Sequence, residues 1–239
     1  MKHIEKYRIN NLDTDMNRTL SLSGILKYMQ DAAFCHMETG KPSYEELFLS
    51  GKAFFINRLN LSIYKTLGSH AEIEAETWAA ESSGVTFNRC FRILSDGKIT
   101  AEAITVWSLY DFHEKKFIRV ADFENGYSTD EMLELDMEKR LHIPKELELS
   151  LVGEHTVEYR DCDMNKHINN TVYGDLLCGY IPEMSGKRVI KFDINYRNEA
   201  SLGENVKVYM KEDEDGEYYF RSVVNGKPNV EALIMTEEI

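Results

Sequence analysis

The chain has 239 residues, 43% hydrophobic and 29% charged, which supplies enough apolar side chains for a packed core and argues against disorder. Its formal net charge of −13 excludes an extended nucleic-acid surface, because neutralising phosphates requires clustered Lys and Arg side chains. This length fits one large domain or two domains of about 100 to 150 residues each.

The four cysteines lie far apart in the sequence and form no CxxC pair: Cys35, Cys90, Cys162 and Cys178. The opening MKHIEKYRIN has no apolar segment typical of a signal peptide. No apolar run approaches about 18 residues, the length that spans a bilayer. We therefore predict reduced thiols, a cytoplasmic location and no membrane partner.

The first half of the chain predicts a strand, a helix and then several antiparallel strands. Residues 3–9 alternate in polarity, and residues 21–40 place apolar side chains at helical spacing up to Gly40. A second short helix is predicted at residues 43–51. From Phe54 to Val120 the polarity alternates with a period of two, which predicts strands, and Asp96-Gly97 marks a hairpin turn.

Residues 122–148 are rich in acidic side chains and predict a linker that contains one helix. Ser128 and Glu131 have the spacing of a helix capping box, and Pro144 would end the segment.

The second half repeats the order of the first. A strand is predicted at residues 155–160, a shorter helix at residues 170–181 before Pro182, and antiparallel strands in the rest. Two such copies can pack their sheets edge to edge. We therefore expect an α+β protein with an N-terminal domain at residues 1–121, the linker at 122–148 and a C-terminal domain at 149–239.

A short repeated phrase marks the duplication: DTDMNRTLSL at residues 13–22 and DCDMNKHINN at residues 161–170. The D-x-D-x-N pattern is similar to the start of an EF-hand calcium loop. Both copies, however, lack the Gly at position 6 and the Glu at position 12, which excludes that site. Asp and Asn side chains also bind nearby backbone N–H groups, so the phrase can serve simply to shape a strand-to-helix turn.

Only the second copy carries a histidine, His167, where the first copy has Thr19. A histidine near a helix start is often structural, but a neutral imidazole can also accept a proton. Free N–H groups at a helix start can hold a carbonyl oxygen that gains negative charge. The concentration of polar side chains in the histidine-bearing copy favours a functional role there.

Asp161 through Tyr173, in the pattern D-x-D-M-N-x-H-I-N-N-x-x-Y, resembles the signature of acyl-carrier-protein thioesterases of the tandem hot-dog type. LSGILKYMQDAA resembles that family's first helix, AETWAAESSGVTFNRCFRIL its first sheet, and INYRNEA at residues 194–200 its second catalytic segment. The resemblance covers nearly the whole chain. It implies two tandem hot-dog domains, each an antiparallel sheet wrapped around a central helix, with catalysis in the second domain.

Carried over residue by residue, the catalytic positions of the family fall on Asp163, Asn165, His167 and Glu199. Ala200 stands where the family often has a cysteine, so cysteine-nucleophile chemistry is excluded at this site. Aligning Leu67-Gly68 with Leu202-Gly203 places Tyr64 opposite Glu199. The first half is therefore expected to lack both ionisable members of the site.

The resemblance implies hydrolysis of a fatty acyl thioester on acyl carrier protein, which bears the acyl chain on a 4'-phosphopantetheine arm. Either His167 or Glu199 can serve as the base that activates water, and a covalent acyl-carboxylate intermediate stays open. Asp163 would orient the imidazole or the water, and Asn165 would hold the thioester carbonyl. No cofactor and no metal are expected, and a homodimer stays open.

The acyl chain and its acidic carrier imply two further sets of residues. One helix face would shape an apolar tunnel, or serve only as core: Ile25, Met29, Ala32 and Ala33. A chain of negative charge needs a local basic patch to dock an acidic carrier, and the candidates are Lys187, Arg188, Lys191 and Arg197.

Two alternatives remain at this point. One is a hot-dog thioesterase that acts on coenzyme A esters, and the other is a non-enzymatic acyl-binding module. A hot-dog hydratase is disfavoured, because its usual motif resembles D-x-N-P-x-H, with a proline and one more residue before the histidine.

Overall fold

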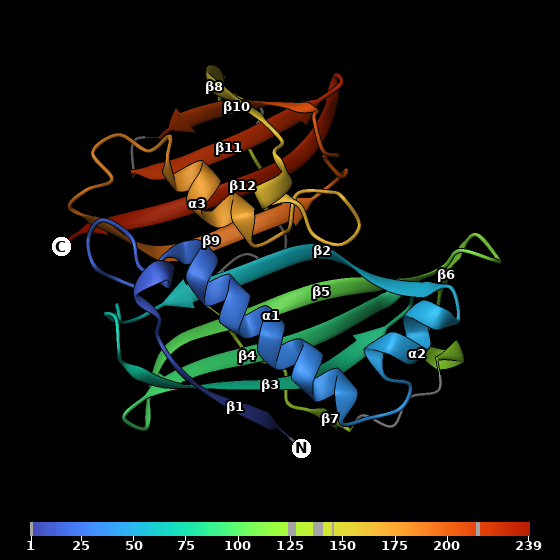
Figure 1. The fold of residues 1–239 in the computed structure, drawn as a ribbon. Helices are drawn as coiled ribbons and strands as arrows, with labels where there is room; N and C mark the ends of the chain where they lie inside the picture. Colours follow the sequence, from blue (N-terminus) through green and yellow to red (C-terminus); the bar gives the residue numbers. More distant parts are fainter. Residues whose placement is uncertain (1, 124–127, 136–140, 145, 214–215) are drawn as a thin grey trace.

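The computed structural model describes residues 2–123, 128–135, 141–144, 146–213 and 216–239. Across these residues one twelve-stranded sheet runs through the molecule, with the first half of the chain on one side and the second half on the other (Figure 1). Its main strand order is β1-β3-β4-β5-β2-β9-β12-β11-β10-β8. β2 and β9 are neighbours at the middle, so the order on one side mirrors the order on the other.

The first half supplies these elements: β1 (His3–Arg8), η1 (Asn11–Asp13), α1 (Leu22–Glu38), α2 (Tyr44–Leu49), β2 (Lys52–Ile63), β3 (Glu72–Ser83), β4 (Thr86–Ser95), β5 (Lys98–Asp111), β6 (Lys116–Ile118) and η2 (Val120–Asp122). After β7 (Thr129–Asp130), the second half supplies β8 (Ser150–Thr156), η3 (Tyr159–Asp161), α3 (Val172–Cys178), β9 (Lys187–Tyr196), β10 (Asn205–Glu212), β11 (Glu217–Val224) and β12 (Lys227–Glu238). The sequential order strand, helix, four strands occurs in both halves, which confirms the predicted duplication.

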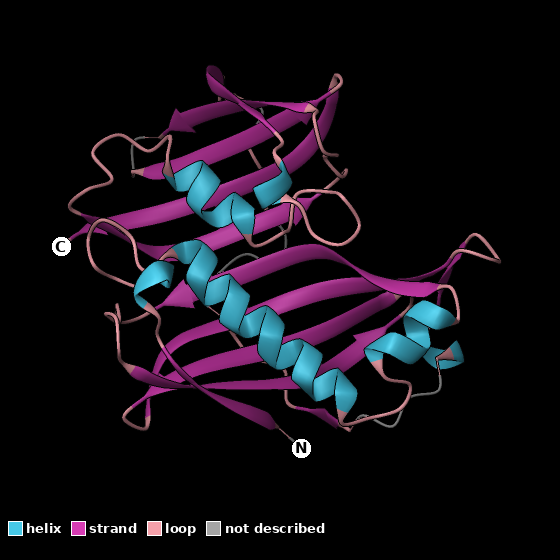
Figure 2. Ribbon diagram, in the orientation of Figure 1, coloured by secondary structure: helices cyan, strands magenta, loops and turns pink. Residues whose placement is uncertain are grey.

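The two central helices lie on the same face of the sheet (Figure 2). α1 follows Ser21, whose Oγ accepts a hydrogen bond from the N–H of Gly24 and so caps the helix. The buried face of α1 carries the residues at helical spacing: Leu22, Ile25, Leu26, Met29, Ala32, Ala33 and His36. Within the described residues, no helix is both long and apolar enough to cross a membrane.

Hydrogen bonds join the two halves of the chain where α1 contacts α3. The Asp175 carboxylate accepts hydrogen bonds from Ser21 Oγ at 3.0 Å and from the Ser23 backbone N–H at 2.9 Å. A Cβ at Gly174 would lie only 3.0 Å from Leu22 Cγ, so a larger residue there would push the helices apart. The start of α3 therefore helps to cap the start of α1.

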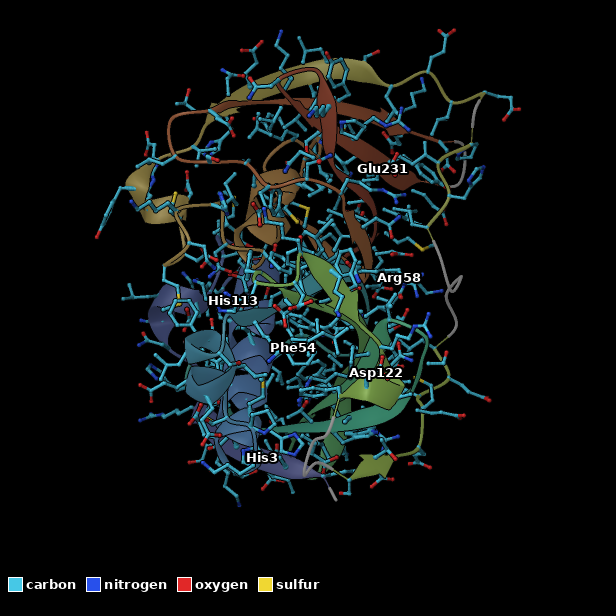
Figure 3. The ribbon with its side chains drawn as sticks, turned by 90° about the vertical axis from the view of Figure 1, so that its right-hand side faces the viewer. His3, Phe54, Arg58, His113, Asp122 and Glu231 are labelled. Atoms are coloured by element: carbon cyan, nitrogen blue, oxygen red, sulfur yellow. The ribbon has the colours of Figure 1, made fainter. Side chains whose placement is uncertain are left out.

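The sheet also crosses between the halves without a break. β2 and β9 pair antiparallel from Arg58 opposite Asn195 to Ser62 opposite Lys191. In the side view, Arg58 lies between Glu231 of the second half and Phe54 of the first (Figure 3). The core runs along the whole helix-covered face of the sheet, and it includes Leu61 and Phe192, both fully buried.

The predicted linker helix is not found at Ser128–Glu131, because Thr129 and Asp130 form the short strand β7 beside β3. Trp78 Nε1 donates to the Glu131 carbonyl at 2.7 Å, and Leu133 is buried against Trp78 on the sheet face opposite α1. Leu133 and Leu135 are two residues apart, a spacing typical of extended chain. The rest of the predicted helix falls partly on residues 136–140, outside the described residues.

Candidate active site

The second copy of the repeated phrase forms a tight turn between η3 and α3. The Asp163 backbone N–H donates to the His167 carbonyl at 2.9 Å, and the Lys166 N–H donates to the Asp163 carbonyl at 3.0 Å. Lys166 takes the left-handed conformation with φ of 66°, which closes the turn. Three of the predicted site residues, Asp163, Asn165 and His167, are therefore held on one short segment.

Within this turn the carboxylate of Asp163 binds Asn165. Oδ1 accepts the Asn165 backbone N–H at 2.8 Å, and Oδ2 accepts the side-chain amide at 3.3 Å. Among the described residues, Asp163 makes no hydrogen bond to the imidazole of His167. In this geometry Asp163 builds the turn, and its expected role of orienting the imidazole or the water stays a prediction.

Glu199 reaches His167 from a distant part of the sequence. The Ile168 N–H donates to the Ala200 carbonyl at 2.9 Å, and the Leu202 N–H donates to the Lys166 carbonyl at 3.0 Å. This pairing brings Glu199 Oε2 to 3.2 Å from His167 Nδ1. The side chains are 29% and 53% exposed, respectively, so the pair lies at the surface and is open to water.

The start of α3 offers fewer free donors than the sequence suggested. Asn169 Oδ1 accepts the Thr171 backbone N–H at 3.0 Å, and the Asn169 carbonyl accepts the Val172 N–H at 2.9 Å. These two N–H groups are thus occupied. The exposed side-chain amide of Asn165, on the same turn as His167, remains as a donor.

A contact from the first half that sequence reasoning missed also reaches the turn. The Tyr44 hydroxyl, at the start of α2, lies 3.6 Å from Met164 Sδ. Burial raises the pKa of Tyr44, and the negative charge of Asp163 adds to that rise. No sequence pattern links residues so far apart, and only the folded chain brings α2 to this turn.

A small cavity of about 30 Å³ lies between α1, the first-half sheet and the second half. Met29 and Ala33 of α1 line it, together with Thr171 and Tyr196. Tyr196 donates its hydroxyl to the Asn170 carbonyl at 3.1 Å, close to the end of the turn. Two of the four predicted tunnel residues are therefore on this side, in a space that holds about one water molecule.

The first copy of the phrase forms a turn with the same backbone. The Asp15 N–H donates to the Thr19 carbonyl at 2.8 Å, and Arg18 has φ of 61°. The Leu20 N–H donates to the Leu67 carbonyl at 2.7 Å, as Ile168 does to Ala200. By this pairing the counterpart of Glu199 is Thr66. The sequence alignment that placed Tyr64 opposite Glu199 was wrong by two residues.

A larger cavity of about 620 Å³ lies beside the first copy. Thr19, Thr66 and Ile25 line it, so Ile25 does not share a cavity with Met29 and Ala33. Ala32 is fully buried and lines neither cavity. The helix face predicted as one tunnel wall is thus divided between the two sides of α1.

Both parts of the chain match families of known proteins. Residues 1–125 match the model of the acyl-ACP thioesterase N-terminal domain, and residues 144–236 match that of the acyl-ACP thioesterase C-terminal domain, where ACP is acyl carrier protein. The chain belongs to the acyl-ACP thioesterase family. The resemblance predicted from the repeated phrase is confirmed.

Curated relatives in this family are distant and longer. A chloroplastic palmitoyl-acyl carrier protein thioesterase of Arabidopsis thaliana is 21% identical over 82% of this chain and 52% of its own length. A chloroplastic oleoyl-acyl carrier protein thioesterase 2 of the same plant is 26% identical over 84% of this chain and 60% of its own. The chain thus spans little more than half the length of the curated relatives it matches.

Two solved structures of the family share the fold over almost the whole chain. An acyl-ACP thioesterase from Bacteroides thetaiotaomicron has a TM-score of 0.87 at 18% identity, covering 99% of this chain and 98% of its own. The 12:0-ACP thioesterase from Umbellularia californica has a TM-score of 0.84 at 15% identity, covering 100% and 97%. These matches confirm the predicted tandem hot-dog fold.

In this thioesterase-family chain burial raises the pKa of every cysteine thiol, which disfavours the nucleophilic thiolate: Cys35, Cys90, Cys162 and Cys178. All four are free, as predicted. Burial raises the pKa of Cys178, and it also raises the pKa of Cys162 with the help of the nearby carboxylates. Ala200 is buried beside Glu199 and provides no thiol.

The basic residues predicted to dock the carrier lie along β9 and directly after it: Lys187, Arg188, Lys191 and Arg197. Lys187 Nζ donates to the Tyr218 hydroxyl at 3.0 Å, Arg188 Nε lies 2.6 Å from Glu237 Oε1, and Arg197 Nη2 lies 2.9 Å from Glu231 Oε2. Lys187 and Arg197 stand at opposite ends of the strand, about 30 Å apart along it. They do not form one compact patch.

Among the described residues, no three His, Cys, Asp or Glu side chains gather closely enough to hold a metal ion.

Proposed function

We propose that this chain hydrolyses the thioester of a fatty acyl group carried on acyl carrier protein, releasing the free fatty acid. The observation that carries the proposal is the His167 Nδ1–Glu199 Oε2 contact of 3.2 Å. It joins two sequence segments that both resemble catalytic segments of the family. The match of both halves to the family models supports the same activity.

In the proposed reaction His167 is the base and Glu199 positions it. A carboxylate at Nδ1 favours the tautomer with its proton on that nitrogen, which leaves Nε2 free to accept a proton from water. The water oxygen then attacks the thioester carbonyl. As the carbon–sulfur bond breaks, the protonated imidazole returns its proton to the leaving sulfur.

The carbonyl oxygen gains negative charge during the attack and needs a hydrogen-bond donor. We assign this role to the side-chain amide of Asn165, which is exposed on the same turn as His167 and only loosely held, at 3.3 Å from Asp163 Oδ2. Asp163 supports the donor by fixing the Asn165 backbone at 2.8 Å. Water attack leaves no covalent enzyme intermediate in this scheme.

We place the acyl chain in the small cavity beside this turn. Met29 and Ala33 of α1 line it together with Phe91 of the first-half sheet, and Asn170 and Thr171, which directly follow the turn, line it from the second half. Its volume of about 30 Å³ is far below that of a fatty acyl chain. Binding therefore requires side-chain movement, and the flexible side chains of Met29 and Gln30 can provide it.

The carrier remains the proposed partner, with docking on Lys187, Arg188, Lys191 and Arg197 kept as a prediction. Reversing the charge of Lys191 should raise the KM for a carrier-linked substrate and leave that for a small thioester unchanged. An equal change in KM for both substrates would mean that the carrier does not dock on β9.

The substrate class is tested by comparing kcat/KM for the same acyl group on acyl carrier protein and on coenzyme A. We expect the carrier-linked group to be hydrolysed faster. Faster hydrolysis of the coenzyme A ester would replace the proposal with an acyl-CoA thioesterase. Retention of the acyl thioester without turnover of either would make the chain a binding module.

A further inference from the structure

The larger cavity, of about 620 Å³, lies beside the first copy of the turn and has no role in the proposed hydrolysis. Thr19 and Thr66 line it at the positions that correspond to His167 and Glu199. Its volume falls within the range of about 300–1,000 Å³ that is typical of small-molecule sites. The larger space is therefore on the side that lacks an ionisable pair.

The interior of this cavity is apolar and is shared by the two halves. Buried side chains from both line it: Ile25, Ile63, Ile93, Ala101, Ile181 and Val189. An aliphatic chain among these residues would be removed from water, a gain of about 25 cal/mol for each Å² of apolar surface buried. A polar ligand would find few partners there.

The edge of the cavity is polar and carries an available cation. Lys65 is exposed, and it has no ion-pair partner among the described residues. The lining carboxylate of Asp15 is already occupied, because it accepts hydrogen bonds from the Asn17 and Thr19 backbone N–H groups. Asp175 is likewise occupied by Ser21 and Ser23.

Two further cations, Lys27 and Arg188, also line the cavity, although each has a carboxylate partner. Glu183, on the turn after α3, is an exposed lining carboxylate that opposes them. Because Lys27 and Arg188 already face carboxylates, and Asp15 and Asp175 keep their charge when they accept hydrogen bonds, the lining has no overall excess of positive charge. The site for one added negative charge is therefore local, at Lys65.

We propose that this cavity is a second, non-catalytic site for an aliphatic carboxylate of the free fatty acid class, with its chain in the apolar interior and its head group at Lys65. Neither threonine hydroxyl is a base at neutral pH, so the site binds and does not hydrolyse. The inference concerns binding alone and does not depend on the proposed hydrolysis.

The test is the number of dodecanoate molecules bound per chain, measured by isothermal titration below the concentration at which dodecanoate forms micelles. Ala101→Leu fills the interior of the large cavity, and Ala33→Leu fills the small one on the other side of α1. We expect Ala33→Leu to keep dodecanoate binding in the large cavity. We expect Ala101→Leu to abolish that binding. Dodecanoate binding that survives unchanged in Ala101→Leu would overturn the proposal.

Lys65→Glu keeps the test valid if Ala101→Leu fails to fold, because Lys65 is exposed. We expect it to weaken dodecanoate binding at this site about three- to tenfold, the scale of a reversed surface ion pair. Lys211→Glu makes the same charge change on β10, outside the cavity lining, and should leave binding unchanged. Equal weakening in both variants, or equally tight binding of dodecyltrimethylammonium, would overturn the head-group assignment.

Discussion

The turn at residues 13–21 and the turn at residues 161–169 repeat one another almost hydrogen bond for hydrogen bond. Asp15 and Asp163 each accept the N–H two residues later, at 2.9 and 2.8 Å. Each turn then donates into a neighbouring segment, Leu20 to Leu67 and Ile168 to Ala200. The shared Asp and Asn therefore build the turn, and their presence alone does not indicate chemistry.

The two asparagines that share a place in these turns have different surroundings. The Asn17 amide donates to the carbonyls of Met184 and Lys187 at 3.1 and 3.0 Å, and its oxygen accepts the Gly186 N–H at 3.2 Å. The Asn165 side chain is exposed. Asn17 thus joins the first half to the turn at residues 184–187 by hydrogen bonds, while the Asn165 side chain is accessible to a ligand.

The remaining difference is one of ionisable groups. His167 and Glu199 lie 3.2 Å apart in the second copy, where the first copy has Thr19 and Thr66. One backbone conformation thus carries an ionisable pair in the second copy and two hydroxyl groups in the first. The comparison teaches that the two turns differ in these two side chains and not in their backbone.

The largest expected effect comes from removing the charge that positions His167. Glu199→Gln keeps the size of the side chain but weakens its hold on the Nδ1 proton. We expect kcat to fall about 10²-fold with KM nearly unchanged, since proton transfer by a positioned group is worth about 10²- to 10⁴-fold. Steady-state kinetics measures this, and Glu134→Gln, an exposed carboxylate outside both turns, should have no effect.

The two helices differ in a buried titratable group, because α1 carries His36 and α3 carries no histidine. Burial, Arg89 and His3 lower the pKa of His36 to about 4. The unfolded chain takes up this proton near pH 6.5, so unfolding free energy is fully retained above that pH and lost as pH falls toward 4. We expect a loss of about 2 kcal/mol by pH 4.5 from this group.

Urea denaturation of the wild-type chain and of His36→Gln at pH 7 and 4.5 isolates that contribution. The glutamine side chain has no proton to gain in this range, so its loss of stability on acidification should be smaller by about 2 kcal/mol. Equal losses in the two proteins would mean that His36 is protonated in the folded state.

A smaller effect should separate the two asparagines. Asn17→Ala removes three hydrogen bonds that hold the turn at residues 184–187, and it should lower the unfolding free energy by about 1–3 kcal/mol. Asn165→Ala should change stability by less than about 0.5 kcal/mol because the side chain is exposed, and it should lower kcat if the amide holds the thioester carbonyl as we propose. A loss of stability in Asn165→Ala with a loss of kcat in Asn17→Ala would contradict these two assignments.

Much of the fold follows from local pattern. The 3.6-residue spacing of apolar side chains places the helix at residues 21–40, and alternation places the strands on either side. The duplicated order then predicts the symmetric sheet. The predicted helix does not start at Ser128, although Ser128 and Glu131 have capping spacing, because burial of Leu133 against Trp78 and pairing with β3 favour extended chain there.

The candidate site is less uniform: His167 and Glu199, from two separate predicted segments, lie together, and their catalytic role stays a prediction. The counterpart of Glu199 in the first half was misplaced. α1 has 17 residues and α3 has 7, so the distance from turn to strand differs between the halves. The two cavities and the contact of Tyr44 with Met164 depend on packing between halves, and no local sequence pattern reports it.

The most direct measurement is single-turnover hydrolysis of an acyl-carrier thioester by His167→Ala and Thr19→Ala, the same change made at matched positions of the two turns. The proposed function predicts at least a hundredfold slower hydrolysis for His167→Ala and a near-normal rate for Thr19→Ala. Normal hydrolysis by His167→Ala, or an equal loss in both, would contradict the assignment of catalysis to the second copy.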